Sequence, residues 1–175
     1  MQRRNFLPLA ALPLTAADGW IELFDGHSLN GWKAGGSQQS WKVEDGLLLG
    51  SGPVSHLYYA GPVQRAMFRN FEMEVEVRSE PACNSGVYFH TAFQESGFPK
   101  KGFEVQINNT ALGEGSYRER KRTGSLYGIR NVYKQLVRDQ EWFRLRVSVR
   151  EKNVQVWVNG LLGVDYTEPT PAVRP

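Results

Sequence analysis

The sequence predicts an all-β protein, built as a two-sheet antiparallel sandwich or jelly roll. Three stretches alternate apolar and polar residues at a period of two, at 71–78, 143–150 and 154–158. Such alternation is typical of strands with one buried and one solvated face. No stretch predicts a helix of three turns, and the 18 Gly and nine Pro suit many turns. Short strands joined by tight turns favour two packed antiparallel sheets.

Two dipeptides predict hairpins between these strands. Asn159-Gly160 separates the apolar run at 154–158 from Leu162 and Val164, and Asp45-Gly46 separates the runs at 41–43 and 47–49. Both dipeptides tolerate the positive φ angles that a two-residue hairpin loop requires. The segment 127–138 is the nearest approach to a helix, and we expect at most one short turn there.

The length and composition predict one domain. The chain has 175 residues, of which 41% are hydrophobic, with five Trp, seven Tyr and nine Phe. This is enough for one hydrophobic core. We find no repeat and no linker, and we expect a single domain over residues 18–175. A Pro-rich segment follows the long hairpin without a closing strand, so we expect the domain to lack its last strand or strands.

The first 17 residues have the features of an export signal. Arg3 and Arg4 precede a mildly apolar stretch at 7–14 and small residues at 15–17. The order R-R-x-F-L resembles a twin-arginine signal, which exports folded proteins. We therefore expect a periplasmic or secreted protein and exclude residues 1–17 from the fold. The alternative is a frayed terminal tail.

Charge, hydropathy and cysteine content argue against a nucleic-acid partner, a membrane span and a disulfide. The net charge is +3, and without Arg3 and Arg4 there are 19 basic and 18 acidic residues, which does not favour a nucleic-acid partner. No apolar run approaches the roughly 20 residues of a membrane helix, so we expect no transmembrane segment. Cys83 is the single cysteine, which excludes an intrachain disulfide. We expect Cys83 to be a small buried residue rather than a nucleophile.

Two further stretches carry a mixed polar face. Strand parity places the side chains of 84–90 and 103–108 alternately on an apolar face and on a polar face. The polar face holds an acid, amides, a phenol and an imidazole, from Asn84, Tyr88, His90, Glu104, Gln106 and Asn108. Such groups can orient several hydroxyls at once, which carbohydrate recognition requires. The alternative is an ordinary exposed sheet face, as the uniform charge row Glu72, Glu74 and Glu76 indicates for its strand.

The sequence also resembles a known family. Its motifs are Trp20-Ile21-Glu22-Leu23-Phe24-Asp25-Gly26, Leu29-Asn30-Gly31-Trp32, and the runs at 41–46, 84–89, 102–107, 123–128 and 157–160. In this order, over about residues 19–168, they resemble the 3-keto-disaccharide hydrolase domain family, also called domain of unknown function 1080. The resemblance implies a concanavalin A-like jelly roll, related to lectins and glucanases. It also implies hydrolysis or elimination of 3-keto-glycosides.

The chemistry can be tested against the residues. Ordinary glycosidases need two carboxylates, whereas the polar row of 103–108 has one acid, Glu104. A ketone at C3 of the sugar acidifies the C2 proton, so that one base suffices and the enolate expels the C1 substituent. We expect Glu104 or His90 to be this base, with Arg130 and Lys134 stabilising the oxyanion. The predicted substrate-binding residues are Asn84, Tyr88, Gln106, Asn108, Tyr127, Arg130 and Lys134.

Two other groups of residues have weaker assignments. Trp32, Trp41, Trp142 and Trp157 are candidates for stacking on sugar rings. Trp142 and Trp157 are the better candidates because they fall on the polar register of their strands, and core packing is the alternative. The charged run 118–122 is expected to be a solvated loop.

Three functions stay open from the sequence. The first is an exported enzyme that cleaves 3-keto-disaccharides or 3-keto-glycosides, downstream of a separate sugar 3-oxidoreductase. The second is a non-catalytic, lectin-like carbohydrate-binding module, and the third is an interaction domain of an envelope assembly. We expect no cofactor, and the three His, at 27, 56 and 90, do not predict a zinc site because they lack metal-ligand spacing. A divalent metal held by carboxylate, amide and imidazole stays open.

Overall fold

The computed structural model describes residues 19–113 and 115–172, so the predicted export signal at 1–17 lies outside the described residues. Within the described part of the chain, strands and two short 3-10 turns form and no α-helix does. No helix there is long and apolar enough to cross a bilayer. The chain divides into two compact units: the described residues up to 67 with Phe93–Phe98, and Phe68–Ala92 with the described residues from Pro99 onward.

The first unit consists of two antiparallel strand pairs. β1 (Trp32–Gly36) pairs with β4 (Ser55–Tyr59), and β2 (Trp41–Glu44) pairs with β3 (Leu47–Gly50). The 3-10 turns η2 (Gln38–Ser40) and η3 (Val63–Ala66) belong to the same unit. The β2–β3 hairpin turns at Asp45 and Gly46, whose φ angles are 51° and 77°. The predicted Asp-Gly hairpin is therefore confirmed.

Two tryptophans of the first unit have packing roles. The indole nitrogen of Trp32 donates to the Leu23 carbonyl oxygen at 3.2 Å, and its ring meets Tyr59 edge-on at 5.3 Å. The indole nitrogen of Trp41 donates to Ser55 Oγ at 2.9 Å. Both side chains are half-buried. The contacts of these two tryptophans are therefore packing contacts, which was the alternative to sugar stacking.

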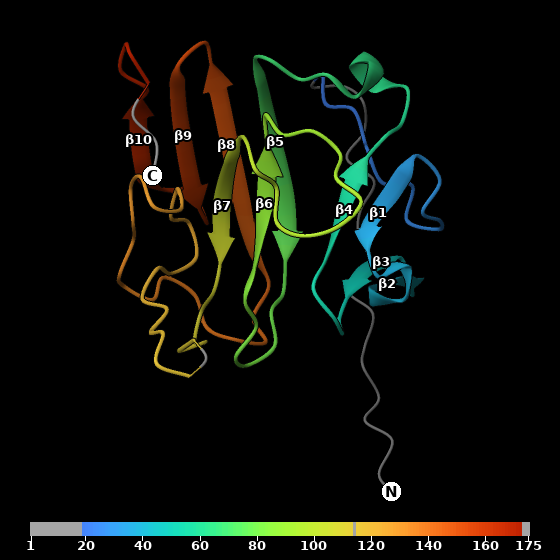
Figure 1. Ribbon diagram of the computed structural model, residues 1–175, viewed down its shortest axis with the longest axis horizontal. Helices are drawn as coiled ribbons and strands as arrows, with labels where there is room; N and C mark the ends of the chain where they lie inside the picture. Colours follow the sequence, from blue (N-terminus) through green and yellow to red (C-terminus); the bar gives the residue numbers. More distant parts are fainter. Residues whose placement is uncertain (1–18, 114, 173–175) are drawn as a thin grey trace, which may run out of the picture. The chain divides into compact units, whose positions relative to one another are not determined.

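The second unit contains a four-stranded antiparallel sheet and a hairpin. The sheet has the order β10–β9–β8–β5 (Figure 1). Its strands are β5 (Phe71–Val77), β8 (Phe143–Arg150), β9 (Asn153–Val158) and β10 (Leu161–Thr167). β6 (Ser85–Phe89) pairs with β7 (Phe103–Ile107), and Figure 1 shows these two strands in front of β5 and β8. Asn159 and Gly160 have φ angles of 50° and 79°, which confirms the predicted Asn-Gly hairpin.

One hydrophobic core holds the two layers of this unit together. Leu145, Val147 and Val156 from the sheet are 0% exposed, as are Val105 and Leu126 from the layer of the hairpin. These residues belong to one contiguous cluster. Burying each such side chain stabilises the fold by about 1.5–3 kcal/mol. The second unit is thus a two-layer antiparallel sandwich, which confirms the predicted all-β sandwich.

The segment after β7 extends the layer of the hairpin. Val105 bridges Leu126, and Leu126 bridges Arg130. The amide of Ile129 donates to the Leu126 carbonyl at 3.0 Å and closes a turn between the bridges. The short turn expected within 127–138 is therefore present, without a helix.

Candidate active site

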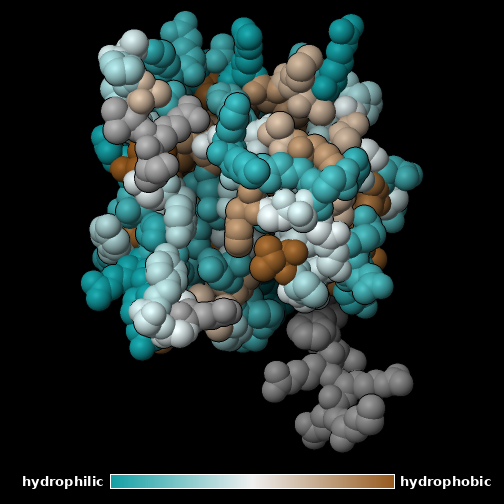
Figure 2. Space-filling model, viewed as in Figure 1, coloured by the Kyte–Doolittle hydropathy of each residue, from teal (hydrophilic) through white to brown (hydrophobic). Residues whose placement is uncertain are grey.

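Three side chains form a row across the outer face of the hairpin layer. The register of β6 and β7 places Tyr88 opposite Glu104. Because Val105 bridges Leu126, Tyr127 is the antiparallel neighbour of Glu104, and its amide donates to the Glu104 carbonyl at 2.9 Å. Side chains that are directly opposite share a face of a sheet. We call Tyr88, Glu104 and Tyr127 the site row. Hydrophilic residues predominate on the face of the molecule drawn in Figure 2.

The side chain of Glu104 packs against β6. Its side chain lies over Gly86, where a Cβ would come within 2.8 Å of Glu104 Cγ. Burial raises the pKa of Glu104, and the charge of Glu119 adds to this effect, while the Tyr88 hydrogen bond and the charge of Lys121 oppose it. A carboxylate with a raised pKa is a stronger base once it is ionised.

Asn84 and Gln106 form a second polar pair beside the row. Gln106 Nε2 donates to Asn84 Oδ1 at 2.6 Å. Gln106 is 1% exposed, and its Oε1 is buried without a hydrogen-bond partner, whereas Asn84 is exposed. Gln106 was expected to contact substrate directly, but the structure buries its side chain behind the exposed Asn84, to which it donates.

Asn108 is a structural clamp rather than a surface residue. It is 0% exposed. Its Nδ2 donates to the carbonyl oxygens of Ala111 at 3.3 Å and Lys121 at 3.1 Å, and its Oδ1 accepts from Arg122 at 3.2 Å. Asn108 lies on the polar face of 103–108, as predicted, but the contacts of the following loop cover this end of the face. Asn108 therefore ties the two ends of the loop 109–122 together and does not reach a ligand.

His90 does not join Glu104. Its φ angle is 53°, so the alternation of β6 ends at Phe89. Its Nε2 lies 3.0 Å from the Arg69 carbonyl oxygen, and its ring meets the rings of Phe71 and Phe89 edge-on at 6.1 and 5.4 Å. These phenylalanines belong to the core side of the sandwich. The expectation that His90 shares the face of Glu104 is therefore wrong.

Arg130 and Lys134, the residues predicted to stabilise the oxyanion, follow the site row along the chain. Arg130 is exposed, and its guanidinium lies 4.9 Å from the centre of the Tyr166 ring. Its Nη1 also donates to the Ile129 carbonyl oxygen at 3.0 Å. Arg130 thus extends toward β10 rather than toward Glu104. Lys134 is exposed in the loop that follows.

A second carboxylate is buried beside the row, within the charged run 118–122 that was expected to be a solvated loop. Glu119 is 2% exposed, so that expectation is wrong for this residue. Its Oε2 accepts from the hydroxyls of Tyr117 at 2.6 Å and Tyr127 at 3.1 Å. Its Oε1 accepts from the backbone amide and the Nζ of Lys121, at 2.8 and 3.1 Å. We call Tyr117, Glu119, Lys121 and Tyr127 the Glu119 cluster.

Hydrogen bonds fix the charges of this cluster. Although burial opposes it, hydrogen bonds from Tyr117 and Lys121 hold the pKa of Glu119 below its usual value. Hydrogen bonds to Tyr117, Glu119 and Tyr127 raise the pKa of Lys121 in spite of burial. Burial, together with the Tyr117 hydrogen bond, raises the pKa of Tyr127 to about 12. At neutral pH the cluster therefore contains an ion pair and a protonated phenol next to Glu104.

The sequence did contain a signal for this cluster. The buried Glu119 and the half-buried Lys121 alternate with the exposed Arg118 and Arg120, at the same period of two that identified the strands. The high charge of the run concealed this pattern. Among the described residues, no group of three or more His, Cys, Asp or Glu side chains is arranged to hold a metal ion.

Two solved structures share this fold. Both are of Parabacteroides distasonis ATCC 8503 proteins, each described as a proposed glycosyl hydrolase. One has a TM-score of 0.68 at 24% identity, over 83% of this chain and 70% of the other. The second has a TM-score of 0.60 at 20% identity, over 78% and 72%. The protein is thus a β-sandwich of the type that these structures adopt.

The family follows from the sequence itself. A family model described as the 3-keto-alpha-glucoside-1,2-lyase-like domain matches residues 19–175. The chain belongs to this family, which confirms the resemblance found in the motifs. A curated relative from Bacteroides thetaiotaomicron, named 3-keto-disaccharide hydrolase, is 32% identical over 96 residues. That match spans 51% of this chain and 33% of the relative.

Proposed function

We propose that the chain cleaves the glycosidic bond of 3-keto-glycosides or 3-keto-disaccharides, with Glu104 as the base that removes the C2 proton. The observation that carries the proposal is the site row, in which a half-buried carboxylate with a raised pKa lies between two tyrosines. The family and the name of its curated relative support this substrate class.

The proposed reaction begins with an elimination. The C3 ketone acidifies the C2–H bond, and Glu104 takes the C2 proton. The electron pair of that bond moves into a C2–C3 enolate, whose negative charge lies on the C3 oxygen. When the enolate collapses, the C1–O bond breaks and the aglycone leaves with that electron pair, taking a proton from an acid or from water. The products are an unsaturated 3-keto sugar and a free alcohol.

Net hydrolysis needs one further step. Water adds its hydroxyl to C1 of the unsaturated sugar, its remaining proton replaces the one that the aglycone took, and the proton on Glu104 returns to C2. The two steps together consume one water and release the 3-keto sugar, so that the elimination can also serve a hydrolase. Glu104 acts first as a base and then as an acid, which a raised pKa favours.

Tyr127 and Lys121 are the groups to which we assign the developing oxyanion, in place of Arg130 and Lys134. Tyr127 stays protonated at neutral pH because its pKa is about 12. Its hydroxyl donates to Glu119 in the free protein, and we propose that it turns to donate to the oxyanion when the substrate binds. Lys121 Nζ lies 4.3 Å from the centre of the Tyr127 ring and supplies positive charge. Asn84 and Tyr88 are assigned to the sugar hydroxyls beside them.

Substrate supply follows from this chemistry. A 3-keto-glycoside must be made by a separate oxidation of the C3 hydroxyl, so a sugar 3-oxidoreductase must act before this protein. From the predicted export signal we propose that the reaction takes place in the periplasm or outside the cell.

Incubation of the chain with the 3-keto derivative of methyl α-glucoside tests the activity, with released methanol as the readout. We expect Glu104→Gln to lose turnover by about 10²-fold or more while binding is retained. Glu141→Gln, at an exposed carboxylate on another loop, should behave as wild type. Binding without turnover in the wild type would instead establish a carbohydrate-binding module.

An isotope experiment separates elimination from direct displacement at C1. Substrate carrying deuterium at C2 should react more slowly than unlabelled substrate, because the C2–H bond breaks in the proposed first step. Equal rates, measured where chemistry limits turnover, would contradict a role for Glu104 as the C2 base.

A further inference from the structure

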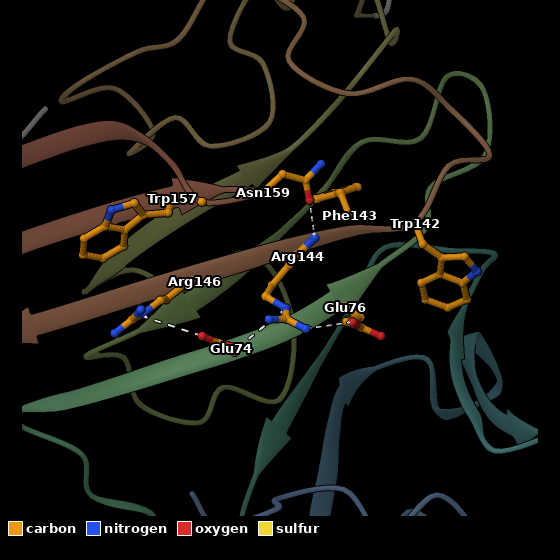
Figure 3. Close-up of a pocket in the computed structure, with 9 residues that line it drawn as sticks. Glu74, Glu76, Trp142, Phe143, Arg144, Arg146, Trp157 and Asn159 are labelled. Carbon is orange, nitrogen blue, oxygen red and sulfur yellow. Dashed lines mark hydrogen bonds and ion pairs between the residues drawn. The ribbon is translucent and has the colours of Figure 1, made fainter. Parts of the chain in front are cut away.

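The outer face of the four-stranded sheet has a hollow of about 610 Å³. Its volume falls in the roughly 300–1,000 Å³ range of small-molecule sites. Figure 3 shows the indoles of Trp157 and Trp142 on either side of a row of charged side chains from β5 and β8. The residues that carry the argument are Glu74, Glu76, Trp142, Arg144, Arg146 and Trp157.

Strand register explains how these side chains come together. Trp157 pairs with Arg146, and Arg146 pairs with Glu74, so the three lie in one row across β9, β8 and β5. Leu162 on β10 pairs with Trp157 and is 45% exposed, which extends the apolar end of the row. Arg144 and Glu76 form the neighbouring pair. Trp142 precedes β8 and is 44% exposed.

The charged groups are balanced and held in place. Glu74 lies 3.7 Å from Arg144 and 3.8 Å from Arg146, and Arg144 lies 3.4 Å from Glu76. Two carboxylates and two guanidinium groups of the lining sum to zero charge. These three distances exceed those of strong charge-assisted hydrogen bonds, whereas Arg146 Nη2 also donates to Glu72 Oε2 at 2.6 Å and is fixed by that bond. Glu74, Glu76 and Arg144 therefore keep capacity for hydrogen bonds to a ligand. Because the charges of the lining cancel, a charged ligand would gain no net attraction.

We propose that this hollow is a second carbohydrate site, which binds a neutral oligosaccharide of glucose-like configuration without cleaving it. A pyranose whose hydroxyls are all equatorial presents C–H bonds on both faces, which pack on an indole, and hydroxyls at its rim. Trp157 and Trp142 supply the indoles, and the Glu–Arg row supplies acceptors and donors for neighbouring hydroxyl pairs. The Arg146 guanidinium, 5.3 Å from the centre of the Trp157 ring, restrains that indole.

This site is distinct from the site row. The site row lies on the outer face of the hairpin layer, whereas the hollow lies on the outer face of the sheet, and the shared core lies between them. The inference therefore goes beyond the proposed function. It also explains why the side chains around the Glu72, Glu74 and Glu76 row include two tryptophans, which plain solvation does not require.

Calorimetric titration of the chain with cellohexaose and maltohexaose tests the proposal, because neither sugar carries a 3-keto group. We expect wild type to bind at least one of them, and Trp157→Ala and Trp142→Ala each to weaken binding about tenfold. Tyr133→Ala, at an exposed aromatic residue outside the hollow, is the matched control. Thermal unfolding of each variant verifies that it is folded, and Trp142, at the sheet margin, is the more tolerant position.

The result is independent of catalysis. Glu104→Gln should bind each sugar with the same affinity as wild type, so that loss of turnover and loss of this binding are separate outcomes. The proposal would be overturned if wild type bound neither sugar. It would also be overturned if Trp157→Ala and Trp142→Ala both bound as tightly as wild type. If an anionic hexasaccharide such as hexagalacturonate bound more tightly than the two neutral sugars, the assignment of a neutral ligand would be wrong.

Discussion

Glu104 occupies, with its side chain, the space that a Cβ of residue 86 would need. A Cβ at Gly86 would lie 2.8 Å from Glu104 Cγ and 2.9 Å from Cδ, closer than real Cβ contacts allow. The φ angle of Gly86 is not positive, so the requirement for glycine comes from the neighbouring strand rather than from a turn. The orientation of the proposed base thus depends on a residue that carries no functional group.

Gly86→Ala should therefore impair activity more than stability. The added methyl displaces the Glu104 carboxylate, and a displacement of about 1 Å costs on the order of 10²-fold in rate. Steady-state kinetics give the change in kcat/KM, and Gly163→Ala is the control because its Cβ would make ordinary contacts at 3.7 Å. Wild-type kcat/KM in Gly86→Ala would show that the position of Glu104 does not matter.

The pH dependence of kcat/KM should report the environment of Glu104. Its pKa is raised above 4.5, so activity should rise with pH along a limb that lies above this value. The charge of Lys121 lowers this pKa and the charge of Glu119 raises it. Lys121→Met should thus move the limb to higher pH and Glu119→Gln to lower pH. Shifts in the same direction would mean that the limb belongs to another group.

Glu119→Gln should destabilise the fold by about 1–3 kcal/mol at neutral pH, because hydrogen bonds to a charged group are lost. The pKa of Glu119 is lowered on folding. The native state therefore favours the ionised form, and this stabilisation is complete above the unfolded pKa and disappears as pH falls through the folded value. The difference between wild type and variant, measured by urea unfolding, should shrink on acidification below about 4.5. A difference independent of pH would contradict the ionised assignment.

Asn108→Ala should lower stability through the loop that it clamps. The substitution leaves the carbonyl oxygens of Ala111 and Lys121, which are buried and part-buried, with one partner fewer, at a cost of about 1–3 kcal/mol. Thermal unfolding measures the change, and Asn84→Ala, at the exposed amide, should cost less. If Asn108→Ala lost activity but kept the stability of wild type, Asn108 would contact the ligand and would not be a structural clamp.

Period-two alternation was a good guide wherever a strand packs one face on the core. It predicted β5, β8 and β9, and it placed Tyr88 and Glu104 on the same face, because neighbouring layers bury the apolar set of each strand. Asn159-Gly160 and Asp45-Gly46 turned as expected, since their positive φ angles are a local property. Local rules were sufficient for these elements.

The errors arose where distant contacts decide the outcome. His90 leaves the strand at a positive φ that no neighbouring residue in the sequence announces, and its ring joins the phenylalanines instead. Glu119 is buried because two tyrosines and a lysine satisfy its oxygens, which composition alone does not reveal. The fold was therefore more predictable than the site, because the site depends on which side chains meet across the layer.

The two bridges of Leu126 confine the backbone of Tyr127. Residues 127–129 form a turn that is closed on one side by Val105 and at its base by Arg130. A sugar that binds against Tyr127 therefore meets a segment whose conformational entropy was already lost when the chain folded. Little of the binding free energy has to be spent on ordering this part of the protein.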